Sequence, residues 1–241
     1  MRYFEAYRFY FDSPKSWLNL LLGAVCILVP IAGPMVLMGW VFGVLERSPR
    51  QWGPGSDFDA NKLGKYISRG VWPLVVQIVV AVPVSMVFGL LWFTLFFGAV
   101  VTAGPQAGPP RFILFVIPGY FIGIVFFAVL VQMISVPLCL RAALMQDFAP
   151  AFNVTWVIDF IKRTWAEMLL SMLFFLVTSP FVALAGLFLC CVGYFPALAL
   201  ISLAQYHMWF QLYDLYLARG GESIPVRAQP VSDTQDQARE N

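Results

Sequence analysis

Three polar side chains follow one another along the last apolar segment of this chain. His207, Gln211 and Asp214 are spaced i, i+4 and i+7, which places them on one face of a helix. An ionisable residue inside a membrane helix is a functional candidate, and histidine titrates near neutral pH, so this polar stripe could form a proton-sensitive pair. We favour the simpler interpretation that Asp214 lies near the cytoplasmic end of the helix and that His207 hydrogen-bonds a neighbouring helix.

Other residue patterns that carry chemistry are missing from the sequence. One histidine and no CxxC pair argue against a zinc site, and no GxSxG, HExxH or GxxxxGK[ST] pattern occurs. Asp57 and Asp59 could suggest metal binding, but Asp59 is better placed to cap a short helix that leads into a longer one. Gln77, Gln132 and Gln205 are typical of hydrogen bonds between membrane helices. We therefore expect no catalytic residue, no cofactor, no metal site and no enzyme.

The elements that must position these residues are unusually apolar. The chain is 60% apolar and 12% charged, about half the charged share of a soluble domain. Four tracts without any Asp, Glu, Lys or Arg hold 146 of the 241 residues: 16–45, 70–110, 112–140 and 168–213. Their apolar runs are continuous rather than alternating, which favours helices over a barrel. The sequence predicts an all-α integral membrane protein, a bundle of about five or six membrane helices at about 20 residues each.

The order of polar and apolar segments predicts a single membrane domain over residues 1–220. The polar stretch 221–241 has no apolar periodicity, so we expect a disordered tail. The expected elements are an interfacial segment at 1–12, a broken hairpin at 14–45, spans at 71–103 and 112–140, an interfacial amphipathic helix at 150–165, and spans at 168–189 and 195–216.

Proline and glycine interrupt two of the apolar segments. Pro30, Gly33 and Pro34 divide the first segment, and Gly193 and Pro196 mark a turn before the last one. The two arms of the first segment would reach only about 24 and 20 Å against a hydrocarbon core of about 30 Å. We expect a short or re-entrant hairpin packed against other helices. One kinked span with an external N-terminus is the alternative.

The placement of cations predicts the orientation. Lys and Arg gather in 46–69, in 141–165 and in the tail, whereas the alternate loops hold only Arg111. The positive-inside rule places the three cationic regions in the cytoplasm, and the cations of the N-terminal segment place it there too. We expect a multi-pass protein of the inner (plasma) membrane with both termini cytoplasmic. No cationic block suggests nucleic-acid binding.

Several apolar motifs together resemble a known family. They are Trp17-Leu18-Asn19-Leu20-Leu21-Leu22-Gly23, Val29-Pro30-Ile31-Ala32-Gly33-Pro34 with Gly39-Trp40, Phe58-Asp59 followed by Arg69-Gly70, Gly193-Tyr194-Phe195-Pro196-Ala197, Gln211-Leu212-Tyr213 and Ala218-Arg219-Gly220-Gly221. From about residue 10 to 221, the chain resembles the bacterial membrane proteins grouped as domain of unknown function 4013. This resemblance implies a multi-helix bacterial inner-membrane protein and supplies no catalytic residue.

The leading functional hypothesis is a non-catalytic accessory or scaffold subunit whose partners are the lipid bilayer and other membrane proteins. Abundant small residues such as Gly33, Gly39 and Gly43 suit close helix packing. The alternative is a small transporter or lipid-handling protein that uses the broken hairpin against the last helix, with the polar stripe in a wet cavity. An enzyme ranks third.

Overall fold

The computed structural model describes residues 1–13, 15–47, 57–103, 109–188 and 193–225. This part of the chain is all-helical and contains no strand, as the sequence predicts. The helices are α1 (Glu5–Arg8), η1 (Phe9–Asp12), α2 (Ser16–Leu28), α3 (Ala32–Arg47), η2 (Ala60–Lys62), α4 (Leu63–Ala103), α5 (Pro109–Met145), η3 (Ala149–Phe152), α6 (Val154–Phe188) and α7 (Tyr194–Ala218).

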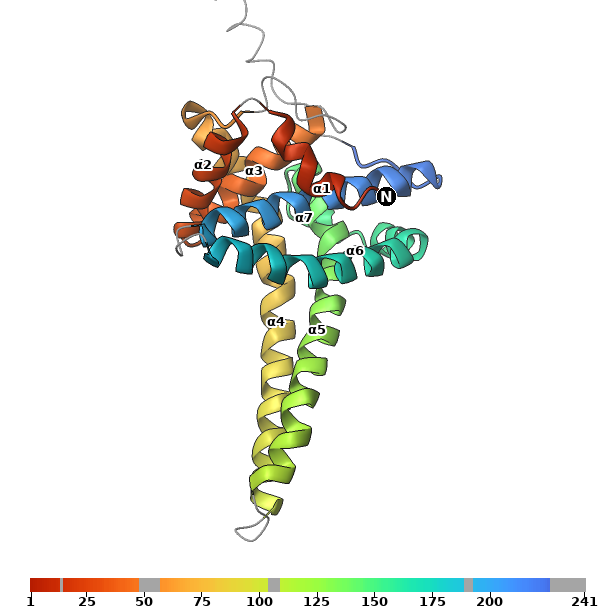
Figure 1. The fold of residues 1–241 in the computed structure, drawn as a ribbon. Coiled ribbons are helices and arrows are strands. Elements are labelled where there is room, and N and C mark those ends of the chain that lie inside the picture. Colours follow the sequence, from red (N-terminus) through yellow and green to blue (C-terminus); the bar gives the residue numbers. More distant parts are fainter. Residues whose placement is uncertain (14, 48–56, 104–108, 189–192, 226–241) are drawn as a thin grey trace, which may run out of the picture.

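The molecule has two parts. Helices α4 and α5 run side by side as a long hairpin, and its distal half projects away from the other helices (Figure 1). We call this distal half, residues 77–103 and 109–134, the outer hairpin. The helix cluster comprises α1, α2, α3, α6, α7 and the near ends of α4 and α5. Helices α6 and α7 pack against each other and lie across the base of the hairpin rather than along it.

Three helices are long and apolar enough to cross a membrane, within 60–98, 118–145 and 154–188. They belong to α4, α5 and α6. Because α6 lies across the other two, the three cannot all cross one flat bilayer along its normal (Figure 1). The crossed arrangement therefore differs from a simple bundle of five or six parallel spans.

The first apolar segment forms a hairpin in the structure, not one kinked helix. Helices α2 and α3 have 13 and 16 residues, so they reach only about 20 and 24 Å. Ile31 takes the left-handed φ of 67°, which is rare for a β-branched residue and reverses the chain. A Cβ on Gly33 would lie 1.5 Å from the Cys26 carbonyl oxygen, so only glycine fits there. Of the predicted break, Pro30 thus lies in the turn between α2 and α3, whereas Gly33 and Pro34 lie in the first turn of α3.

Two glycines set the distance between α3 and α4. A Cβ on Gly39 would lie 1.8 Å from the carbonyl oxygen of Tyr66, and one on Gly70 would lie 1.9 Å from that of Met35. Each glycine therefore receives the backbone of the opposite helix. Neither position has room for a methyl group, so α3 and α4 touch backbone to backbone, as helices in membranes do through small residues.

Several expected boundaries differ from the observed ones. The segments 150–165 and 168–189, expected as separate elements, form the single helix α6 from Val154 to Phe188. No glycine or proline lies between 154 and 179, so nothing in the backbone interrupts the helix. Likewise, α4 begins at Leu63 rather than at 71, and its interior Pro73 and Pro83 do not end it.

The expected N-cap is confirmed. The Asp59 side chain accepts a hydrogen bond of 3.0 Å from the Asn61 N–H at the start of η2, which leads directly into α4. The α6–α7 turn includes 189–192, outside the described residues, and Gly193 is the N-cap of α7. Pro196 lies in the first turn of α7, where its missing N–H has no helical partner to lose.

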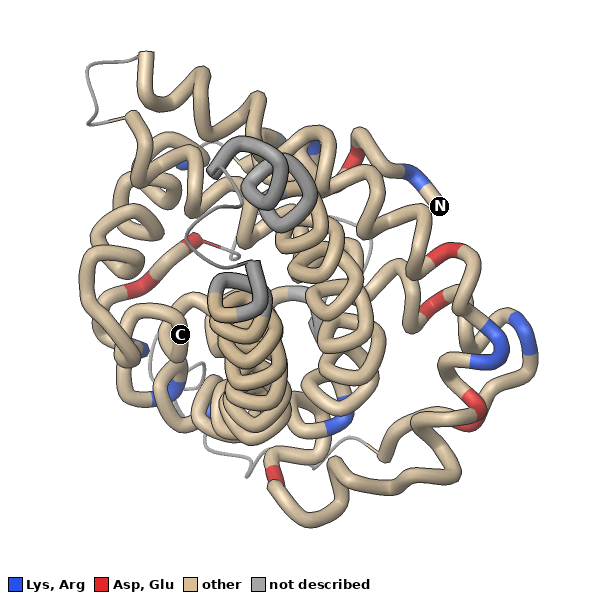
Figure 2. The backbone as a smooth tube through the Cα atoms, turned by 90° about the horizontal axis from the view of Figure 1, so that it is seen from below, with Lys and Arg blue, Asp and Glu red and all other residues tan. Residues whose placement is uncertain are grey.

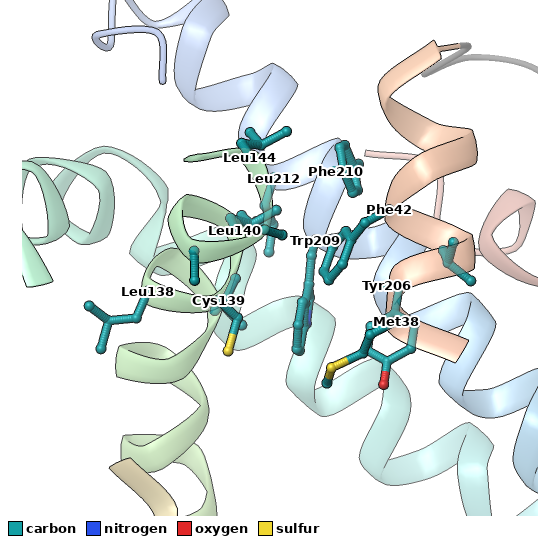
Figure 3. Packing of buried hydrophobic residues seen from close by; sticks show 14 of the residues in the cluster. Met38, Phe42, Leu138, Cys139, Leu140, Leu144, Tyr206, Trp209, Phe210 and Leu212 are labelled. Carbon is teal, nitrogen blue, oxygen red and sulfur yellow. The ribbon is translucent and has the colours of Figure 1, made fainter. Parts of the chain in front are cut away.

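The buried core joins α3, α5 and α7. Figure 3 shows Trp209 of α7 between Phe42 of α3 and Cys139 of α5. Trp209 is 3% exposed, Phe42 is 1% exposed and Cys139 is fully buried. The buried thiol packs as a small apolar group and donates to the carbonyl oxygen of Pro73 at 3.5 Å. This core holds the base of the hairpin to α3 and to α7, and α7 carries the polar stripe.

Candidate functional site

The polar stripe on α7 binds the N-terminal segment of the same chain. Gln211 Oε1 accepts a hydrogen bond of 2.9 Å from the Arg2 N–H, and its Nε2 donates to the Arg2 carbonyl oxygen at 3.3 Å. Gln211 Nε2 also lies 3.2 Å from His207 Nδ1. The His207 ring stacks on Phe9, with ring centroids 3.9 Å apart, and is 7% exposed. Two members of the stripe therefore act together as a clasp for residues 2–9, while Asp214 is exposed.

Aromatic rings extend this clasp onto α6. Tyr3 and Tyr7 pack on Phe174 with ring centroids 5.4 and 6.0 Å apart, and the Tyr7 hydroxyl lies 3.1 Å from Thr178 Oγ1. The Tyr10 side chain is fully buried and donates to the Ser16 carbonyl oxygen at 2.9 Å. Phe4, by contrast, is 78% exposed. The expected interfacial segment 1–12 thus consists of two short helical turns that lie against α6 and α7.

A second polar group holds the start of α2. Asp57 Oδ1 accepts hydrogen bonds from Ser13 Oγ at 2.7 Å and from Asn19 Nδ2 at 2.9 Å, and Asn19 Oδ1 accepts from the Phe58 N–H at 3.0 Å. The hydrogen bond from Ser13, followed by that from Asn19, holds the pKa of Asp57 below its usual range. Burial, with the charge of Asp57 nearby, raises the pKa of Tyr10. Asp57 is therefore a structural anchor that stays ionised.

A third polar group ties the start of α6 to the end of α7. Asp159 accepts from Arg163 Nε at 2.9 Å and from the Tyr216 hydroxyl at 3.0 Å. Arg219 forms an ion pair with Glu167, with one Nη1–Oε2 distance of 3.0 Å. Asp159 and Arg163, two charges of the segment 150–165, therefore bond to the C-terminal end of α7.

The residues after α7 continue this contact. Gly220 has a φ of 76°, and the Gly221 N–H donates to the Tyr216 carbonyl oxygen at 3.0 Å, which ends the helix in a left-handed turn. The Ile224 N–H donates to the Tyr213 hydroxyl at 2.8 Å, and the Ile224 side chain is 3% exposed. Residues 221–225 thus pack on the cluster, whereas 226–241, the rest of the expected tail, lie outside the described residues.

An apolar cavity of ≈ 550 Å³ lies where α5, α6 and α7 meet. Aliphatic, methionine and aromatic side chains form most of its wall, and none of the described residues that line it is charged. Its polar members are Gln132 of α5, Ser171 of α6 and Gln205 of α7. The Ser171 hydroxyl donates to the Met168 carbonyl oxygen at 2.7 Å. The two glutamine amides make no hydrogen bond to any other described residue, so the structure does not show the interhelical hydrogen bonds expected of them. Both amides are available to a ligand in the cavity.

The family comparison covers the chain from within α2 to the turn before α7. The model described as "Protein of unknown function (DUF4013)" matches residues 22–191. The chain belongs to this family. No curated protein and no solved structure matches it.

In this DUF4013 protein, some features of these sites can be predicted from the sequence and others cannot. The spacing of His207 and Gln211 indicates a shared face, but no sequence signal pairs that face with Arg2 and Phe9. The cavity of this DUF4013 chain has no motif, because its wall comes from three helices that meet only in the fold. Within the described ranges of the chain, no group of three or more His, Cys, Asp or Glu side chains could hold a metal ion.

Proposed function

We propose that this DUF4013 protein is a non-catalytic accessory or scaffold subunit of the bacterial inner membrane, anchored by its α4–α5 hairpin. The observation that carries the proposal is the bare surface of the outer hairpin. Only 6% of the most apolar part of α4 is buried inside the molecule. Met86, Val87 and Leu90 are each more than 60% exposed. An apolar surface of this extent needs lipid or protein around it.

The length and charge of the outer hairpin suit a bilayer. Its α4 arm, residues 77–103, has a length of about 40 Å at 1.5 Å per residue, more than the hydrocarbon core of about 30 Å. No Asp, Glu, Lys or Arg lies between Arg69 and Arg111 or between Arg111 and Arg141. Seen along the hairpin, the coloured charged residues lie around the helix cluster, and Arg111 is the single charged residue in the sequence of the outer hairpin (Figure 2).

The positive-inside rule then orients the protein. Arg111, beside the tip of the hairpin, is the single cation among residues 70–140, and all the other Lys and Arg residues lie before or after that stretch. The helix cluster and both termini therefore belong on the cytoplasmic side, with Arg111 on the far side. Exposed apolar side chains on α6, such as Leu173 and Phe181, support a position of the cluster partly in the cytoplasmic leaflet.

The outer hairpin also offers a site for a partner helix. Gly89 is exposed, and a Cβ there would meet nothing within 4 Å. Ser85, one turn earlier, is exposed as well. Small residues one turn apart let the backbone of a second membrane helix approach closely. The glycines of α5 differ, because a Cβ on Gly123 would meet the Phe88 ring of α4 at 3.2 Å within the hairpin itself.

The polar stripe supports a structural role over a catalytic one. Gln211 and His207 hold the N-terminal segment through hydrogen bonds and ring stacking, so neither is free to handle a solute. The same contacts weigh against a transport path along the stripe.

The test is a native mass spectrum of the protein extracted in mild detergent, with Gly89→Leu as the variant. We expect a stoichiometric protein companion on the wild type that the variant loses. Gly64→Leu is the matched control, because Gly64 is also exposed on α4 with nothing within 4 Å of its Cβ but lies outside the outer hairpin. A wild-type chain that leaves the membrane without any protein companion contradicts the proposal.

A further inference from the structure

We propose that the cavity between α5, α6 and α7 binds one acyl chain of an ester-linked membrane glycerolipid, whose ester carbonyl accepts a hydrogen bond from Gln132 or Gln205. The α5 arm of the outer hairpin forms one wall of this cavity, so the inference rests on the proposed membrane placement of that hairpin, but it does not depend on the scaffold role. It rests on the size of the cavity, the direction in which it opens and its two amides.

The size of the cavity fits a single lipid chain. Ligand pockets commonly measure about 300–1,000 Å³, and this cavity of ≈ 550 Å³ falls within that range. A methylene group occupies nearly the volume of one water molecule in the liquid, about 30 Å³, so the cavity has room for roughly 18 such groups. That is the size of one long acyl chain. The absence of charge from its lining excludes the lipid headgroup and a charged metabolite from its interior.

The cavity opens towards the hydrocarbon of the bilayer. Ile124 and Val125 line it and are also 37% and 38% exposed on the outer hairpin. Leu173 and Leu176 of α6 line it as well and are 56% and 52% exposed. Its mouth is therefore bordered by apolar side chains that face outward. A ligand that enters here comes from the lipid phase rather than from water.

The polar group of the ligand would lie in the half of the cavity nearer the helix cluster, where Val136 of α5 extends the wall one turn beyond Gln132. On α5, Ala128 lies one turn and Ile124 two turns from Gln132 towards the hairpin tip, so these lining residues extend over about 12 Å. A glycerolipid of the cytoplasmic leaflet has the same order, with its ester near the membrane surface and its chain pointing to the bilayer centre. The lipid and the cavity are therefore oriented alike.

The two glutamines specify an ester rather than a hydrocarbon alone. Neither amide has a hydrogen-bond partner among the described residues, and an unmatched amide in an apolar surrounding costs free energy. An amide N–H can donate to an ester carbonyl oxygen but finds no acceptor on a methylene chain. The residue types in the cavity wall thus match both parts of a lipid tail: the chain against the apolar wall and the ester against the amides.

The first test is whether filling the cavity removes a bound lipid. The wild type and Ala128→Phe are purified in mild detergent, incubated with a diacyl phosphatidylglycerol and measured by native mass spectrometry. Ala185→Phe is the control, because Ala185 is exposed on α6 and does not line the cavity. We expect one lipid per wild-type chain and per control chain, and at least a tenfold loss of occupancy in Ala128→Phe. Equal retention by Ala128→Phe, or no retention by the wild type, overturns the proposal.

The second test separates the amides from the shape of the cavity. Gln205→Leu and Gln132→Leu keep the side-chain size, and each variant is titrated with the diacyl lipid and with its dialkyl ether analogue, which lacks the carbonyl groups. We expect the wild type to prefer the ester lipid by about fivefold, as one hydrogen bond allows. The double variant should lose the preference and still bind the ether lipid. No preference in the wild type contradicts the role of the amides, and an unchanged preference in the double variant does so as well.

Discussion

The contact between α3 and α4 gives the sharpest prediction about stability. In Gly39→Ala, the new Cβ would lie 1.8 Å from the Tyr66 carbonyl oxygen. An ordinary contact of this kind begins near 3.4 Å, so the two helices must separate by about 1.6 Å or bend. The reciprocal contact of Gly70 with the Met35 carbonyl oxygen, 1.9 Å from an ideal Cβ, opens with it. A gap of 0.5–1 Å already forfeits about a quarter to a half of the dispersion energy of each contact.

The magnitude follows from two opposing effects. Alanine favours a helix over glycine by about 1 kcal/mol, which works in favour of the variant. Overpacking against a backbone atom costs about 1–3 kcal/mol or more, and here the obstacle is a carbonyl group in another helix rather than a flexible side chain. We expect Gly39→Ala to lower the free energy of unfolding by about 2 kcal/mol. In a chain of this size that lowers Tm by roughly 4–8 °C.

The assay is thermal unfolding in detergent, followed by the loss of the monodisperse peak in size-exclusion chromatography. Gly89→Ala is the matched control, because Gly89 is in a helix and a Cβ there meets nothing within 4 Å. The control should be unchanged or slightly more stable than the wild type. If Gly39→Ala is as stable as Gly89→Ala, the backbone contact between α3 and α4 is not as close as described.

Two further predictions concern the polar contacts. Gln211→Ala removes both hydrogen bonds to the Arg2 backbone and should raise hydrogen exchange in residues 1–12 by about tenfold, whereas Asp214→Asn, at an exposed position, should leave that exchange unchanged. Asp57 has a lowered pKa, so its contribution of about 1 kcal/mol is present above pH 4 and is lost as the pH falls through the folded-state pKa. Wild-type Tm should therefore fall more than that of Asp57→Asn between pH 5 and pH 3, and parallel curves would refute the anchor role of this carboxylate.

Local features of the fold could be predicted from the sequence because their causes are local. Pro30 and Pro34 each remove an amide donor, so the hairpin turn follows from covalent structure. Asp59 caps η2 through its own side chain, two residues from its partner. The change from an amphipathic to a fully apolar pattern predicts a boundary at about residue 166, and this prediction is wrong, because no residue there breaks the helix.

The arrangement of the helices could not be predicted in this way. Gly39 was recognisable as a packing glycine, but its partner Tyr66 is known only from the fold. The crossing of α6 over the hairpin depends on how whole helix surfaces fit together. Hydrophobicity shows that α6 is apolar but does not specify the direction in which it runs relative to α4 and α5. Gln132 and Gln205 were visible as membrane amides, yet the cavity that they share forms only after α5 and α7 are in place.

The clasp between the two ends of the chain has a consequence for biosynthesis. Arg2 and Gln211 are 209 positions apart, so residues 1–12 are translated well before the helix that they bind. At about 5–20 residues per second, the ribosome takes roughly 10–40 s to make the intervening chain. Throughout that interval the aromatic side chains of 1–12 remain at the membrane surface without their native contacts to α7. Residues 1–12 thus reach their native contacts later than many of the residues that are translated after them.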